Sequence, residues 1–94
     1  MSGKTKNILI LSRRDHEEAM RVAAGMTIFG HQVALTFMDR ALSDAEVNGE
    51  QAELLELADI VPTTTVAEMA EHLDFLDEKA LGQAINASDM VVSL

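Results

Sequence analysis

Cysteine is absent from this 94-residue chain, and so are tryptophan and tyrosine. Without a thiol the chain has no disulfide, no thiolate metal site and no cysteine nucleophile. Apart from histidine, its only aromatic residues are three phenylalanines. We therefore expect an aliphatic hydrophobic core in which six methionines serve as adaptable filler.

Long apolar runs are also missing. No segment approaches the roughly 20 apolar residues that span a bilayer. The run at residues 8–11 is too short for the apolar region of a signal peptide. We therefore expect a cytoplasmic protein with no membrane partner.

Positive charge is scarce in the second half of the chain. Residues 1–40 hold six basic and four acidic side chains, whereas residues 41–94 hold one basic and twelve acidic side chains. Because proteins bind nucleic acid by neutralising phosphates with Lys and Arg, a nucleic-acid partner is not expected. The acidic residues indicate either a basic protein partner or simply solvated helix faces.

Two apolar runs without alternation, Asn7–Ser12 and residues 32–38, predict strands that are buried on both faces. Between them Asp15 can cap a helix, with Glu18 as its capping-box partner, and Gly30 can end that helix in the left-handed conformation. The apolar stripe of this helix consists of Ala19, Met20, Val22, Ala23 and Met26. This order predicts two parallel strands joined by a right-handed crossover.

The rest of the chain continues the alternation of strands and helices. It predicts, in chain order, a loop at 44–48, a helix at 50–58, a strand at 59–62, a helix from Thr65, a helix at Glu78–Ala87 and a closing strand at 90–94. Residues 72–77 alternate between apolar and polar, which fits either a brief edge strand or a loop. The predicted fold is a single α/β domain over residues 1–94, with three layers and helices on both faces of a mostly parallel sheet of four to five strands, as in flavodoxin.

Ligands of such sheets bind outside the carboxyl ends of the strands. The candidate ligand-binding residues at that edge are Ser12, Arg13, Arg14, Asp39, Thr63, Thr64 and Thr65. Two predicted helix N-termini and the arginines favour a small anion there. Alternatively, the arginines lie in solvent or pair with Glu17 and Glu18.

Familiar motifs of catalysis and cofactor binding are missing. The first strand is followed by Ser-Arg-Arg-Asp, not by a glycine-rich phosphate loop, so we expect no nucleotide cofactor. His16, His31 and His72 form no H-x-x-x-H pair, so no metal site is expected. We expect no catalytic residues, because residue order alone supports no Ser-His-Asp arrangement.

Two segments resemble a known family. Residues 24–39, AGMTIFGHQVALTFMD, are similar to the first helix and second strand of the DsrE/DsrF/DsrH-like superfamily of sulfur-relay, TusBCD-like proteins. Residues 85–94, INASDMVVSL, are similar to its closing helix and strand, and the first strand fits as well. The resemblance implies a five-stranded parallel sheet and oligomers, often trimers or hexamers, that include mixed assemblies.

The same resemblance implies a function. Active members of the family carry sulfur as a persulfide on a cysteine after the third strand, whereas the matching stretch here, residues 61–66, is VPTTTV. We therefore expect a non-catalytic subunit or adaptor of intracellular sulfur relay. It would form homo-oligomers or hetero-oligomers with cysteine-bearing sulfur carriers. The alternative is a regulatory domain that binds a small anion in the strand-end groove.

The sequence leaves two possible roles for one group of apolar residues. Met69, Leu73, Phe75 and Leu76 lie around a segment too short to form a core of its own. They either form an exposed patch used in assembly or close the edge of the sheet within one chain.

Overall fold

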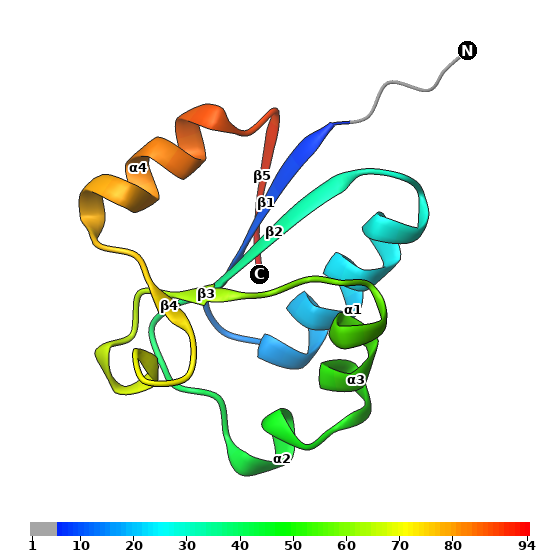
Figure 1. The fold of residues 1–94 in the computed structure, drawn as a ribbon, viewed down its shortest axis with the longest axis vertical. Coiled ribbons are helices and arrows are strands. Elements are labelled where there is room, and N and C mark those ends of the chain that lie inside the picture. The colour runs from blue at the N-terminus through cyan, green and yellow to red at the C-terminus, as the bar shows by residue number, and fades with distance from the viewer. Residues whose placement is uncertain (1–5) are drawn as a thin grey trace.

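The chain forms a five-stranded, all-parallel sheet with helices on both faces, which confirms the predicted α/β fold (Figure 1). The computed structural model describes residues 6–94. The strands are β1 (Asn7–Ser12), β2 (Gln32–Phe37), β3 (Thr63–Thr64), β4 (Asp74–Phe75) and β5 (Met90–Ser93). Their order across the sheet is β4-β3-β2-β1-β5, so β1 lies between its successor β2 and the last strand, β5.

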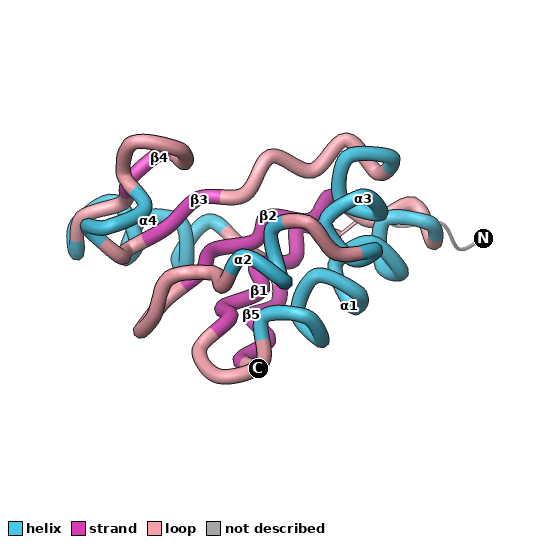
Figure 2. Tube along the Cα trace, turned by 90° about the horizontal axis from the view of Figure 1, so that it is seen from below, coloured by secondary structure: helices cyan, strands magenta, loops and turns pink. Residues whose placement is uncertain are grey.

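The helices are distributed unequally over the two faces. They are α1 (His16–Ile28), α2 (Asp44–Val47), α3 (Glu50–Leu57) and α4 (Glu78–Ala87), with a 3-10 turn η1 (Ala67–Met69). Helix α1 packs on β1 and β2 and against α3. Helix α4, which connects the two opposite edges of the sheet, lies alone on the other face (Figure 2).

The core is aliphatic, as composition predicts, and lies between the sheet and the α1–α3 layer. Alternate residues of β1 and β2 contribute to it, including Ile8, Ile10 and Leu35, together with Phe37, the one phenylalanine among its buried members. Leu9, which is only 1% exposed, points to the opposite face of the sheet.

Local signals read from the sequence define the first half of the fold. The Asp15 carboxylate accepts a hydrogen bond from the Glu18 backbone N–H and caps α1. Gly30 ends the same helix with a φ of 88°, in the left-handed region that glycine occupies readily. The strand at residues 32–38 is confirmed as β2, one residue shorter than predicted.

The predicted strand at residues 59–62 is wrong, because β3 occupies Thr63–Thr64 instead. Asp59, with a φ of 62°, lies in the turn that ends α3. The backbone N–H of Ile60 still donates a hydrogen bond to the Leu55 carbonyl of that helix. Pro62 has no N–H to donate to a ladder, so the strand begins only after it.

The predicted helix from Thr65 is also wrong. Thr65 N–H donates to Phe37 O and so continues the pairing of β3 with β2. The Thr64 hydroxyl, rather than Thr65, accepts from the Val66 N–H, and only the 3-10 turn η1 follows. The predicted loop at residues 44–48 is wrong as well, because residues 44–47 form α2, which Ser43 caps. The alternative left open for residues 72–77 is settled, because Asp74–Phe75 form the edge strand β4.

None of the helices within residues 6–94 is both long enough and apolar enough to cross a membrane.

Replacing Leu9 with Ala should lower the free energy of unfolding by about 2–5 kcal/mol, because truncation of this buried side chain leaves a cavity between the sheet and α4. Leu57→Ala is the matched control, since Leu57 is 82% exposed and its truncation should cost less than about 0.5 kcal/mol. Urea unfolding followed by circular dichroism measures both. Equal losses in the two variants would contradict the described packing.

Candidate functional site

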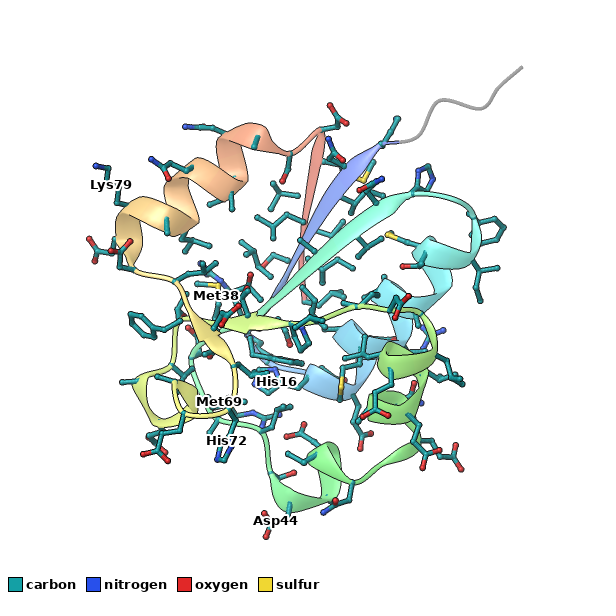
Figure 3. The ribbon with its side chains drawn as sticks, in the orientation of Figure 1. His16, Met38, Asp44, Met69, His72 and Lys79 are labelled. Carbon is teal, nitrogen blue, oxygen red and sulfur yellow. The ribbon has the colours of Figure 1, made fainter. Side chains whose placement is uncertain are left out.

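A buried histidine joins the ends of the two central strands. His16 Nδ1 lies 2.5 Å from the Ser12 hydroxyl at the end of β1, and His16 Nε2 lies 2.9 Å from the Arg40 carbonyl beyond β2. Ser12 and His16 are both fully buried. The ring also packs edge-on against Phe37, with centroids 4.9 Å apart. Figure 3 shows His16 near the centre of the molecule.

The position of His16 follows from the geometry of α1. It is the first residue of the helix, and the buried residues Ala19, Met20 and Ala23 lie three to seven residues later on the same face. Sequence reasoning missed this role. The available signal was that the apolar stripe of the helix, extended backward by one turn, includes residue 16.

The hydrogen bonds define which nitrogen of the neutral ring carries the hydrogen. A carbonyl only accepts, so Nε2 must carry the hydrogen that bonds to Arg40 O. In the neutral ring Nδ1 then accepts from the Ser12 hydroxyl. Both nitrogens and the hydroxyl are used internally and have no contact with solvent, so this Ser–His pair offers no nucleophile that a substrate could reach.

A second buried polar group, Glu46, fixes the loop that carries Arg40. The two guanidinium nitrogens of Arg40 bond to the two carboxylate oxygens of Glu46 at 2.8 and 2.9 Å, and one of them also donates to Arg14 O. Glu46 also completes a capping box with Ser43 at the start of α2. The hydrogen bonds from Arg40, with smaller ones from Ser43, lower the pKa of Glu46 to about 2 against the opposing effect of burial.

The three threonines predicted as ligand contacts lie together but have different surroundings. Thr64 is fully buried, and its hydroxyl donates to Phe37 O. The Thr63 hydroxyl bonds to that of Thr36 at 2.8 Å. Thr65 is half-buried and lines a hollow of about 520 Å³ beside α4.

The predicted charged contacts remain at the surface. Arg13, Arg14 and Asp39 are exposed, and the backbone N–H groups of both arginines donate to Leu94 O. Within residues 6–94 neither guanidinium forms an ion pair with Glu17 or Glu18, because Glu18 pairs with Arg21 instead. Asp39 adopts a φ of 70°, which aspartate tolerates, and turns the chain toward Arg40.

The strand ends therefore bring together Ser12, Arg14 and the turn at Asp39, with the threonines on the neighbouring strand. Ser12 and Thr64 are sealed from solvent. Binding of an anion by this group stays a prediction that would rely on the exposed members. His16 and Glu46, which the prediction omitted, are the residues that organise this edge.

The described residues contain no group of three His, Asp or Glu side chains that could hold a metal ion. His31 lies at the far end of the sheet, where its Nδ1 accepts from the Lys6 N–H. His72 is exposed and lines a cavity between α2, α3 and η1.

Comparisons of the chain with protein-family models, with curated proteins and with solved structures found no match. The class that the fold defines is an α/β protein with a five-stranded parallel sheet.

Glu46→Gln should destabilise the protein most at neutral pH. The folded-state pKa of Glu46 lies below its ordinary value, so its contribution is present above about pH 5 and is lost as the pH falls toward about 2. We expect a loss on the order of 1–3 kcal/mol at neutral pH, reduced from the full linkage value because Arg40 is partly exposed.

Unfolding free energies of wild type and variant across this pH range measure the effect. Glu53→Gln on the exposed side of α3 is the control and should behave like wild type throughout. A difference between wild type and Glu46→Gln that does not shrink in acid would refute the role of the Arg40–Glu46 pair.

Proposed function

We propose that this chain is a non-catalytic subunit that works by assembling with other chains. The observation that carries this proposal is an exposed apolar strip at the β5 edge and on α4. Val91, in register with Leu9 on the α4 side of β5, and Ile85 on α4 are each about 40% exposed, and α4 has no fully buried residue. Met90 is as exposed but alternates to the other side of β5. An edge strand with an unpaired side and apolar neighbours is a surface that a second chain can cover.

The chemistry of the strand ends supports a role without catalysis. The chain has no cysteine, and threonines occupy residues 63–65, where the resemblance to the DsrE/DsrF/DsrH-like superfamily implies a persulfide cysteine. A threonine hydroxyl cannot carry a persulfide. The Ser12–His16 pair is closed to solvent and fully hydrogen-bonded.

The finer proposal is that the partners belong to intracellular sulfur relay. It rests on the resemblance of residues 24–39 and 85–94 to that superfamily, and a five-stranded parallel sheet is the fold that the resemblance implies. In such an assembly a chain without cysteine would complete or position a cysteine-bearing carrier, either in a homo-oligomer or in a mixed trimer or hexamer.

The alternative is a domain that binds small anions at the strand ends. One observation favours it, because Arg13 and Arg14 are exposed and are not neutralised by the glutamates of α1. Fewer groups would contribute than the sequence predicts, since Ser12 and Thr64 are buried and bonded internally. We therefore place it second.

Light scattering on the purified protein should give the mass of a trimer or hexamer. Val91→Lys places a charge in the apolar strip and should shift the mass toward one chain. Val61→Lys is the control, because Val61 is 80% exposed on the loop before β3, far from β5 in the sheet order, and the variant should assemble normally. A wild-type monomer would contradict the assembly proposal.

The proposed role in sulfur relay is tested by a separate binding experiment. The immobilised protein should retain a carrier that a persulfide-specific alkylating reagent labels, and Val91→Lys should retain less of it than Val61→Lys does. An assembled protein that binds no persulfide-bearing carrier would refute the sulfur role and leave the assembly proposal standing.

A further inference from the structure

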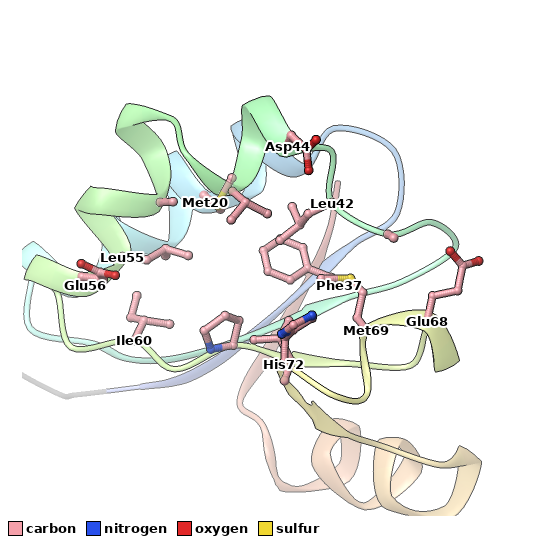
Figure 4. A pocket seen from close by; sticks show the side chains of 15 residues that line it. Met20, Phe37, Leu42, Asp44, Leu55, Glu56, Ile60, Glu68, Met69 and His72 are labelled. Carbon is pink, nitrogen blue, oxygen red and sulfur yellow. The ribbon is translucent and has the colours of Figure 1, made fainter.

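A cavity opens on the α1–α3 side of the sheet because one connection is short. A full helix usually joins neighbouring parallel strands and covers the sheet between them. Here β3 and β4 are joined through η1, which is a single 3-10 turn. The space that such a helix would fill remains between α2, α3 and η1 (Figure 4).

The cavity has the size and wall chemistry of a small-molecule site. Its volume is about 550 Å³, within the range of typical ligand pockets. Its floor consists of side chains that are already part of the core or pack against it: Met20, Phe37, Leu42, Leu55, Ile60 and Met69. These residues come from several elements that pack together, so the walls are preformed rather than assembled from one mobile loop.

The rim of the cavity is acidic. Three exposed carboxylates line it, Asp44 from α2, Glu56 from α3 and Glu68 from η1, and Figure 4 shows them on different sides of the opening. Within residues 6–94 none of the three takes part in an ion pair.

Positive charge at the cavity is sparse. His72 is the only lining residue that can become cationic, and the nearby Arg40 is held by both carboxylate oxygens of Glu46. The negative charge of the three rim carboxylates is therefore not neutralised by a permanent positive charge among the lining residues. An apolar floor beneath an uncompensated negative rim favours molecules that are apolar at one end and cationic at the other.

We propose that this cavity binds a small apolar molecule that carries a single ammonium group. The apolar body enters the cavity beside Leu42, the floor residue that is only half-buried, and the ammonium lies at the rim within reach of the carboxylates. The site is independent of the assembly surface, because it lies on the opposite face of the sheet from α4.

The charge distribution selects against the other occupants. An apolar carboxylic acid would place its charge among three carboxylates, which raises the cost of binding. A bare metal ion would gain little, because the three carboxylates are spread around the opening and do not form a cluster.

The test uses three probes that share a naphthylmethyl body and differ in charge. They are 2-naphthylmethylamine, which is cationic, 2-naphthylmethanol, which is neutral, and the carboxylate 2-naphthaleneacetate. Each is titrated into the full chain, and the dissociation constant is obtained from NMR shifts of the amides of Leu55 and Met69. The ammonium should bind about tenfold more tightly than the carboxylate, with the alcohol between them. Added salt should reduce the preference, because the rim is exposed.

Variants separate the contributions of rim and floor. Glu56→Gln combined with Glu68→Gln should reduce the preference for the ammonium to less than about threefold, while the alcohol binds as before. Glu53→Gln on the same helix as Glu56 does not line the cavity and should leave all three constants unchanged. Ala52→Leu fills part of the cavity and should weaken all three probes.

Three results would overturn the proposal. They are binding of the carboxylate as tight as that of the ammonium, retention of the full preference in the double variant, and the absence of shifts for any probe at millimolar concentration.

Discussion

The structure depends on one buried polar bridge at the centre of the sheet. His16 links the end of β1 to the backbone beyond β2, through Ser12 on one side and the Arg40 carbonyl on the other. Because an unsatisfied polar group in this position would cost about 1–3 kcal/mol, the bridge fixes where α1 begins and where the chain leaves β2. That path places Arg40 against Glu46, and this pair in turn orients α2.

The same bridge determines which polar groups at the strand ends are turned inward. It uses Ser12 and His16 for internal hydrogen bonds, in the region where parallel sheets usually hold their chemistry. Two apolar surfaces remain on opposite faces, namely the strip at β5 and α4 and the cavity beneath α2 and α3.

Most of the fold could be predicted because its signals are local, as with the apolar run of β1, the Asp15 cap and the glycine that ends α1. Predictions failed where a tertiary contact decided the outcome. Thr65 stays extended because its N–H pairs with Phe37 O, which no local pattern reveals. The candidate site was found only in part, since the buried role of His16 depends on a carbonyl 24 residues away along the chain.

Nitrogen-15 NMR of the histidine rings tests the central claim most directly, because it reports which ring nitrogen carries hydrogen. The account predicts that His16 carries a hydrogen at Nε2, and that this ring N–H exchanges with water far more slowly than those of the exposed His72 and the half-buried His31. A His16 ring protonated at Nδ1 alone, or one that exchanges as rapidly as His72, would contradict a sealed bridge and return the strand ends to consideration as an open site.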